Sequence, residues 1–471
     1  MSSGFIWIKG RTKMVAQTVR LNVVEETIVD DITNEKPAMD IDQEKLARLK
    51  AKLAEKTKDI DIVKQEEPMS VKPVKKERSI NFGIIGSGQA GSKLAQQFRE
   101  YNYDCIVLNT TQNDLKFIDV PESNKLLLEY NSIGGAARTL SIGREATEAN
   151  ADAIKEMVSK QLADAQVFVL CSSLGGGSGA GSCEVLVNIL NELGKPIIII
   201  GVLPMHSEDL KAKSNAMETL AVLSKDLQNK KVANIILVDN ARIEAIYSNV
   251  GQMDFYSIAN KAIVEPLDMF NMLSSSPSSI KSLDSMEWLK ILIDSSGYST
   301  YGSMEIEDYS SETSIAEAII SNMNNNLLAS GFNIKESKYV GFIVAANKTV
   351  WKSIPAVAIN YANALLTEQC GTPEIFRGIY EIDEPRDVVK IYSFFSGLGI
   401  PAERTAQLTE EIKNLSNVVK EKETARNLNV ALNTGKNTTI TDAQKIKDKI
   451  AAKTSTFGKF VGGNVVDRRK Q

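Results

Sequence analysis

The chain alternates between short continuous apolar runs and longer segments in which apolar residues recur every three or four positions. Continuous runs are typical of strands buried on both faces of a parallel sheet, and the wider spacing is typical of helices that pack on such a sheet. The pattern therefore predicts an α/β fold with a doubly wound parallel sheet, whose ligands bind at the carboxyl ends of the strands. The predicted strands of this sheet are INFGII, DCIVLN, AQVFVLCS, PIIIIGVLP and ANIILVDN.

The pattern also divides the rest of the chain. Residues 241–275 predict one long central helix, which ends at the breaker cluster SSSPSS. Residues 289–400 predict a second, smaller α/β domain with the strand candidates KYVGFIVAAN, EIFRGIYEI and DVVKIYSFFSGLGI. A C-terminal helix and tail are expected over residues 401–471, and the helix places four apolar side chains on one face: Leu408, Ile412, Leu415 and Val419.

Residues 1–78 differ from the rest of the chain, because they combine prolines and mixed charges with few aromatic residues. This composition predicts a flexible N-terminal arm. Inside the arm, Leu46, Leu49 and Leu53 have helical spacing. We expect either a short solvated helix or a helix that docks on a neighbouring subunit.

Composition excludes several classes of protein. The net charge of −4 and the pI near 5.6 give no basic surface for nucleic acid, so direct sequence-specific binding of nucleic acid is not expected. Four widely separated cysteines form no CxxC pair, which argues against zinc sites and disulfides and favours a reducing compartment. His206 is the single histidine, which argues against His-based triads.

The apolar runs are also too short for a membrane protein. None approaches the roughly 18 apolar residues of a membrane span, and the opening residues lack the apolar centre of a signal peptide. We therefore expect a cytoplasmic protein with no membrane contact.

A first glycine cluster follows the first predicted strand. Gly86, Gly88 and Gly91 match GxGxxG between a strand and a helix, the context of a dinucleotide fold. A dehydrogenase also needs an acidic residue at the end of the second strand for the ribose. That strand ends instead in Asn109 and Thr110.

A second cluster, with five glycines within residues 175–181, follows a different strand. One pyrophosphate does not need two glycine loops, whereas two loops at one sheet edge suit a triphosphate. Neither loop contains the GxxxxGK[ST] phosphate loop, so backbone amides and helix dipoles would have to bind the phosphates.

The two loops resemble the GQ[AC]G and GGGTG[ST]G motifs of the tubulin and FtsZ superfamily. They stand here as Gly88-Gln89-Ala90-Gly91 and as the run from Gly175 to Gly181, with Ser178 in place of threonine. GGAARTLSIG is similar to the third loop of the plasmid- and phage-encoded TubZ tubulins. The resemblance covers roughly residues 80–425, and it departs from FtsZ at Thr111, where FtsZ has aspartate.

This resemblance implies a GTP-binding domain over residues 79–240, with Mg²⁺ accompanying the nucleotide. It implies that Glu208 contacts the ribose, that Asn240 binds guanine, and that Tyr256 and Asn260 stack on the ring and bond its edge. Tyr256 and Asn260 are four residues apart and share one helix face. The implied nucleotide contacts are Gly86, Gly88, Gln89, Ala90, Asn109, Gly135, Ala136, Gly175, Gly176, Gly177, Ser178, Gly179, Ala180, Glu208, Asn240, Tyr256 and Asn260.

A final motif, SLDSMEWLKIL, ends the predicted central helix and catalytic loop over residues 241–288. Asp284 and Glu287 match the two acids of the family motif NxDxxE, and Ser282 replaces its asparagine. In the superfamily this loop enters the nucleotide pocket of the next subunit, where the acids polarise water. The alternative is a solvated acidic turn that starts a helix.

The resemblance therefore implies a GTPase that assembles head to tail into filaments and completes its active site on assembly. Resemblance to TubZ further implies a role in positioning plasmid or phage DNA, through a DNA-bound adaptor that the basic tail DRRKQ contacts. Two alternatives remain open. One is an NAD-dependent oxidoreductase that uses only the first glycine loop, and the other is a nucleotide-binding scaffold that does not hydrolyse.

Overall fold

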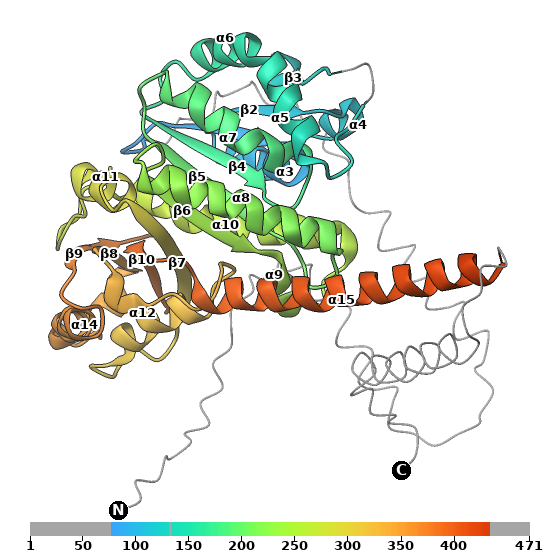
Figure 1. The fold of residues 1–471 in the computed structure, drawn as a ribbon. Helices are drawn as coiled ribbons and strands as arrows, with labels where there is room; N and C mark the ends of the chain where they lie inside the picture. Colours follow the sequence, from blue (N-terminus) through green and yellow to red (C-terminus); the bar gives the residue numbers. More distant parts are fainter. Residues whose placement is uncertain (1–76, 131–133, 434–471) are drawn as a thin grey trace, which may run out of the picture. The chain divides into compact units, whose positions relative to one another are not determined.

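The computed structural model describes residues 77–130 and 134–433. Within these residues the predicted alternation of strands and helices is present (Figure 1). The predicted helix of the N-terminal arm and the basic tail lie outside the described residues. The elements up to the end of the sixth strand are β1 (Phe82–Ser87), α3 (Gly88–Glu100), β2 (Asp104–Asn109), α4 (Gln112–Lys116), β3 (Lys125–Leu127), α5 (Leu140–Ala149), α6 (Ala151–Gln161), β4 (Val167–Ser173), α7 (Ser178–Asn191), β5 (Ile197–Leu203), α8 (Leu210–Gln228) and β6 (Asn234–Asp239).

The remaining elements build the C-terminal half around the other end of the sheet. Its strands and helices are α9 (Asn240–Ile246), α10 (Gln252–Leu273), α11 (Ser285–Ile293), β7 (Gly297–Ile306), α12 (Ser314–Asn324), β8 (Tyr339–Ala346), α13 (Lys348–Trp351), α14 (Ala356–Gln369), β9 (Glu374–Glu381), β10 (Val389–Leu398) and α15 (Ala402–Asn433).

The described strands form one sheet of ten, in the order β3-β2-β1-β4-β5-β6-β7-β10-β8-β9. Strands β1 to β6 pair with one another only in parallel. Ser87 at the end of β1 pairs with Leu108 of β2 and Ser172 of β4, so these strands end level with one another. β7 pairs in parallel with β6 and antiparallel with β10, and it thereby joins the predicted GTP-binding domain to the second α/β domain.

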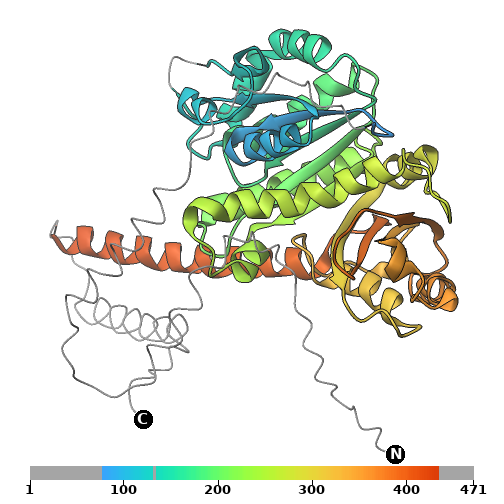
Figure 2. The ribbon, with the colours of Figure 1, turned by 180° about the vertical axis from the view of Figure 1, so that it is seen from behind.

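Helices cover both faces of this sheet, as a doubly wound fold requires. Figure 1 shows α5 to α8 over one face, and the view from behind in Figure 2 shows α3 and α10 over the other. β5 explains the continuous apolar runs, because Ile197 and Ile199 enter one buried core while Ile198 and Ile200 enter the other. A strand with both faces buried has no polar positions to alternate.

The prediction of one helix over residues 241–275 is wrong. The structure has two helices there, α9 and α10, separated by residues 247–251. α9 ends at Ile246, with Tyr247 as its C-cap, and Gly251 then takes an extended conformation as the N-cap of α10. The predicted end of the helical pattern at the serine-rich cluster is confirmed, because α10 ends at Leu273.

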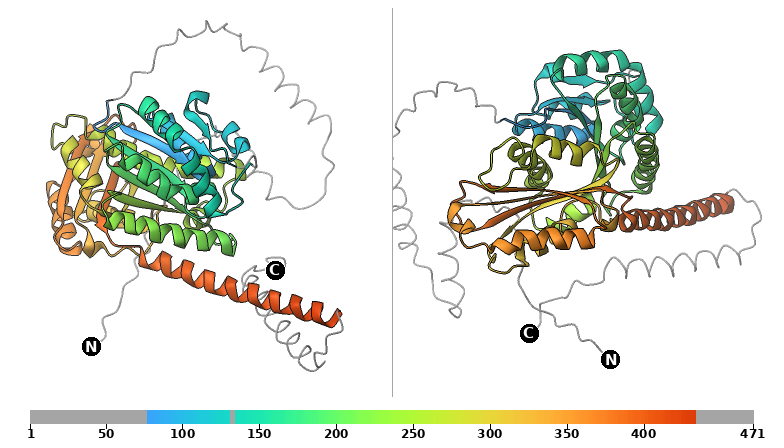
Figure 3. Two further views of the ribbon diagram at one scale, coloured as in Figure 1. Left: turned by 45° about the horizontal axis from the view of Figure 1, so that its top comes forward. Right: turned by 90° about the vertical axis from the view of Figure 1, so that its left-hand side faces the viewer.

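The predicted C-terminal helix is present as α15, but its apolar face is covered only near its start. Leu408 is fully buried, whereas 39% of Val419 is exposed. Figure 3 shows the first turns of α15 against the α/β elements and the later turns extending away from them. Among the described residues, no helix has the length and apolar character needed to cross a membrane.

Candidate functional site

Two glycine-containing turns lie against each other at the carboxyl edge of the sheet. The first joins β1 to α3, and the second joins β4 to α7. Gly88 has a φ of +70°, which favours glycine, and a Cβ at this position would lie 2.9 Å from the amide nitrogen of Gly179. The hydroxyl oxygens of Ser87 and Ser182 are 2.6 Å apart across the same contact. The two loops therefore converge, as the sequence predicts.

The two helices that start on these turns have free amino ends. The N-cap residues of α3 and α7 make no side-chain capping bond. The first amides of a helix have no partner within the helix, and the helix dipole gives them a partial positive charge. Two sets of donors therefore meet at one place, which is an arrangement that binds an anion.

The predicted site residues in these turns differ in packing and in exposure. A Cβ on Gly86 would lie 2.7 Å from the carbonyl oxygen of Gly91, and a Cβ on Gly175 would lie 2.9 Å from that of Ala212. Close backbone packing therefore accounts for Gly86 and Gly175. The predicted residues that are at least partly accessible in the two turns are Gln89, Ala90, Gly176 and Ser178, and those buried between the turns are Gly177, Gly179 and Ala180.

A third loop, residues 134–138, adjoins the second glycine turn. The amide of Gly135 donates to the carbonyl oxygen of Thr110 at 2.9 Å, and a Cβ on Gly177 would lie 2.8 Å from the Cβ of Ala136. Gly135, Ala137 and Arg138 all have positive φ, at 92°, 42° and 59°. Strained backbone of this kind persists only where the surrounding structure holds it, and it gathers at binding sites.

The end of β2 contributes hydroxyl groups. Thr110 Oγ1 lies 2.5 Å from Ser178 Oγ, which connects β2 to the start of α7. Asn109 is 1% exposed, and its side chain bonds Asp114 Oδ2 at 3.1 Å and the amide of Thr111 at 3.2 Å. Asn109, a predicted contact, thus uses both ends of its amide to order its own loop.

Glu208 lies in the loop between β5 and α8. Its Oε1 accepts from the amide of Met205 at 3.1 Å, and its Oε2 is 3.9 Å from the guanidinium of Arg138. Arg138 also pairs with Asp209, and Asn215 donates to the carbonyl oxygens of Arg138 and Gly175 at 2.8 and 3.3 Å. Neither Arg138 nor Asn215 is predicted from the sequence to have a role, although Arg138 stands inside the motif GGAARTLSIG.

The first turns of α10 carry the predicted base-binding pair. The ammonium nitrogen of Lys93, on α3, lies 4.8 Å from the ring centre of Tyr256. Burial raises the pKa of Tyr256, and the nearby carboxylates of Glu208 and Glu244 raise it further. Asn240 and Asn260 are half-buried. Tyr256 is therefore close to the loop of Glu208 and to the helix that starts on the first glycine turn.

The acidic loop begins α11. Asp284 Oδ1 accepts from the amide of Glu287 at 2.8 Å, and Glu287 Oε2 accepts from the amide of Asp284 at 3.0 Å. This reciprocal pair is a capping box, the local structure that an acidic turn at a helix start predicts. It uses one oxygen of each carboxylate, and Asp284 is exposed.

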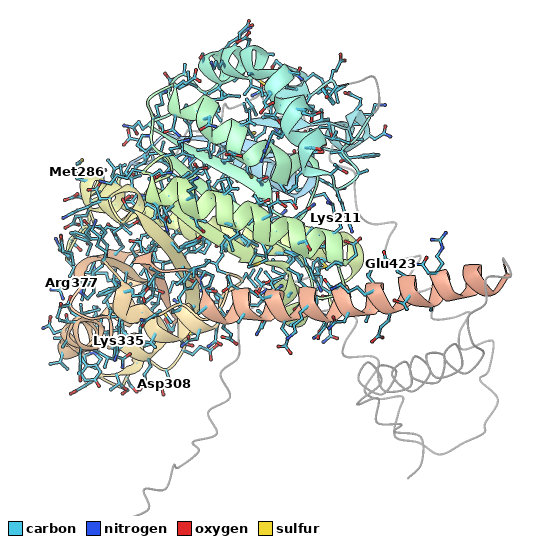
Figure 4. The ribbon with its side chains drawn as sticks, viewed as in Figure 1. Lys211, Met286, Asp308, Lys335, Arg377 and Glu423 are labelled. Carbon is cyan, nitrogen blue, oxygen red and sulfur yellow. The ribbon has the colours of Figure 1, made fainter. Side chains whose placement is uncertain are left out.

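The acidic loop and the glycine turns occupy opposite edges of the sheet. Asn234, the first residue of β6, donates to the carbonyl oxygen of Leu292 in α11 at 2.9 Å, while the other end of β6 leads into Asn240. α10 spans the same distance, with Tyr256 at its start and Phe270 stacked on Trp288 of α11 at its end. Those fourteen residues rise about 21 Å. Figure 4 shows the two edges through Met286 of α11 and Lys211 of α8, which lie on opposite sides.

Two family models match consecutive parts of the chain. Residues 80–248 match the GTPase domain of the Tubulin/FtsZ family, and residues 269–409 match the C-terminal domain of the TubZ-like Tubulin/FtsZ-like proteins. The chain belongs to the tubulin/FtsZ superfamily. Its predicted tubulin fold is confirmed, and the match to a GTPase domain gives no support to the alternative of an NAD-dependent oxidoreductase.

Individual relatives agree with this membership. The chain is 28% identical over 322 residues to the tubulin-like protein CetZ of Pyrococcus furiosus, across 67% of this chain and 84% of CetZ. It is 24% identical over 389 residues to TubZ of Bacillus cereus, across 75% of this chain and 87% of that TubZ. Its fold is similar to that of TubZ from Bacillus thuringiensis serovar israelensis in a GTPγS-form protofilament. The TM-score is 0.66 and the identity is 20%, across 74% of this chain and 96% of that TubZ.

The predicted site residues lie in the two matched regions and in the segment between them. The glycine turns, Glu208 and Asn240 lie inside the matched GTPase domain. Tyr256 and Asn260 lie between the two matched regions, and Asp284 and Glu287 lie inside the TubZ-like C-terminal domain. The two sets of residues that the tubulin resemblance assigns to one reaction are thus in different domains and at different edges.

Proposed function

We propose that this tubulin-family GTPase assembles head to tail and hydrolyses GTP at the contact between two copies. The observation that carries the proposal is the separation of the two edges. A GTP on the glycine turns of one chain is beyond the reach of Asp284 and Glu287 of the same chain. A second copy stacked in the same orientation brings its acidic loop to that nucleotide, and such a contact repeats without closing.

In this proposal each part of the nucleotide has its own residues. The uncapped amides of α3 and α7 and the loop of residues 134–138 bind the phosphates. Glu208 binds the ribose. Asn240, Tyr256 and Asn260 bind guanine, in line with the roles that the resemblance to tubulin implies.

The capping box prepares the acids for their part in the reaction. Because Asp284 Oδ1 and Glu287 Oε2 are fixed by backbone amides, the two carboxylates are held in one orientation before a second subunit arrives. Asp284 Oδ2 and Glu287 Oε1 remain to orient a water molecule toward the γ-phosphate, with Lys281 3.9 Å from Glu287 Oε1. Preorganised groups cost little reorganisation during reaction.

Magnesium is expected to arrive with the substrate. Among the described residues, no group of three or more histidine, cysteine, aspartate or glutamate side chains could hold a metal ion. Mg²⁺ is commonly bound by phosphate oxygens and water with few protein ligands, so this chain fits an ion carried by GTP. When bound, it neutralises phosphate charge.

Apolar side chains at both edges support the head-to-tail contact. Phe117 follows α4 at the nucleotide edge and is 84% exposed. Ile280 and Met286 flank Asp284 at the opposite edge and are 55% and 70% exposed. Large exposed apolar side chains are costly to leave in water, so their burial between subunits would stabilise the contact.

The proposal predicts that phosphate release from GTP has a threshold in protein concentration. Below the threshold both phosphate release and light scattering should vanish. Met286→Lys should raise the threshold at least tenfold, since burial of a methionine side chain contributes about 1.5–3 kcal/mol. Ala153→Lys is the control, because it adds the same charge at an exposed position of α6 and should leave the threshold unchanged. Turnover proportional to protein with no scattering would contradict assembly, and GTP binding without turnover at any concentration would favour the scaffold alternative.

We further propose that the filaments position plasmid or phage DNA. Support comes from the TubZ-like C-terminal domain match at residues 269–409. Deletion of residues 434–471 should increase loss of the DNA element that encodes the chain while leaving the polymerisation threshold unchanged. Equal retention of that element by both chains would contradict a role of the tail in DNA positioning.

A further inference from the structure

Arg404 is a charged residue in the interior of the structure. It lies in the first turn of α15, and 1% of its surface is exposed. A buried guanidinium is tolerated when its nitrogens have partners, and each of the three guanidinium nitrogens of Arg404 has one. Nε lies 3.0 Å from Asp239 Oδ1, Nη2 donates to the carbonyl oxygen of Pro204 at 2.9 Å, and Nη1 donates to Glu411 Oε1 at 3.3 Å.

The contact with Asp239 connects Arg404 to residues 239–241, which join β6 to α9, carry Asn240 and are called the guanine loop below. Asp239 is the N-cap of α9, because its Oδ1 accepts from the amide of Ala241 at 3.1 Å. Asn240 is the residue between them and the first residue of α9. Arg404 therefore fixes the carboxylate that fixes the first turn of α9, and with it the backbone of Asn240.

The contact with Pro204 connects Arg404 to residues 204–209, which join β5 to α8, carry Glu208 and are called the ribose loop below. Pro204 directly follows β5, and the loop continues to Glu208. Glu411, two helical turns along α15, holds the same loop from a second point. Its carboxylate lies 2.7 Å from His206 Nδ1 and 2.8 Å from Lys213 Nζ.

We infer that Arg404 is a positioning residue for the nucleotide site, which holds the guanine and ribose loops in register and makes base recognition depend on the docking of α15. The inference rests on the proposed function, because Asn240 and Glu208 receive their roles there. Coupling of this kind is reciprocal, so GTP binding should also tighten the docking of α15.

The test compares the affinities of GTP and ATP by fluorescence titration of the full chain. The first variant is Arg404→Leu combined with Asp239→Asn, since asparagine preserves the N-cap and no buried charge is left unpaired. It should lower the ratio of GTP to ATP affinity about tenfold, a coupling of ordinary size. Arg426→Leu removes the same charge from an exposed position of α15 and should leave the ratio unchanged.

A second set of variants separates positioning from loss of stability. If Arg404 acts through Asn240, adding the two substitutions to Asn240→Ala should lower the ratio no further than Asn240→Ala alone. Arg404→Lys keeps the charge without the planar fork and should give an intermediate ratio, which covers the case in which the first variant does not fold.

The outcomes distinguish this inference from the proposed function. A wild-type chain that binds ATP as tightly as GTP would overturn the proposed guanine site itself. A wild-type chain that prefers GTP, with the same preference in the folded Arg404 variants, would overturn only the role of Arg404. Slower hydrogen exchange in the first turns of α15 when GTP is added, lost in the variants, is the expected reciprocal effect.

Discussion

Asp284→Asn should bind GTP and form filaments but release phosphate at least a hundredfold more slowly than the wild-type chain. Asparagine caps a helix as well as aspartate does, so the capping box keeps its bond to the amide of Glu287. What the variant loses is the charge that orients water against the γ-phosphate, and such positioned groups contribute about 10²–10⁴-fold to rates. Phosphate release per unit of sedimented polymer is the measurement.

The choice of asparagine follows from the structure. Asp284→Ala removes both the charge and the cap, and loss of a cap costs about 1 kcal/mol. An alanine variant alone would therefore mix a catalytic effect with a folding effect. Asp284→Ser keeps a cap without charge and is the matched control, since it should behave as asparagine does. Normal phosphate release by polymers of either variant would remove Asp284 from the reaction.

Gly179→Ala should weaken GTP binding about tenfold to a hundredfold. A Cβ on Gly179 would lie 2.9 Å from the carbonyl oxygen of Ser87 and 3.1 Å from that of Ser173. These are backbone atoms of the two converging turns, so the turns must separate to admit a methyl group, and overpacking of this kind costs about 1–3 kcal/mol. Isothermal titration with GTP and Mg²⁺ measures the loss.

Gly251→Ala is the control for this prediction. Nothing lies within 4 Å of a Cβ at Gly251, the N-cap of α10, so alanine clashes with nothing there, and its weaker capping costs about 0.5–1 kcal/mol of stability without separating the glycine turns. Unchanged GTP affinity in Gly179→Ala would show that the meeting point of the turns does not bind phosphate. Mixing Gly179→Ala with Asp284→Asn provides a joint test, because one of the two contacts between unlike subunits then has an intact nucleotide edge facing an intact acidic loop. Phosphate release should recover in the mixture.

The apolar pattern of the sequence predicts most of the fold because buried parallel strands leave a strong signal. β2 and β5 are found in this way, since their apolar runs feed both cores. β7 is missed, because its sequence GYSTYGSMEI has no continuous apolar run although Ser299 and Thr300 are fully buried. The break between α9 and α10 is missed because the apolar spacing continues across it.

The residues of the candidate site also fall into those that the sequence predicts and those that it misses. Glycine turns can be found from sequence, because the residue type itself reports an unusual backbone or a close approach. Asn109 shows the limit of that approach, since its side chain turns out to order its own loop. Arg138, Asn215 and Arg404 could not be placed from sequence. Each acts on a loop distant in the chain, and Arg404 lies 165 residues from Asp239.

β7 gives the chain a mechanical property that two separate domains would lack. It bonds β6 through residues 297–299 and β10 along nearly its whole length, so the halves share backbone hydrogen bonds rather than a flexible linker. Tension applied along a filament would load the bonds of β7 to β6 and to β10 together, since residues 297–299 pair with β6 and residues 298–306 pair with β10. Cutting the chain there would leave two exposed strand edges prone to aggregation, so the shared sheet holds the two halves of this protein as one elastic unit.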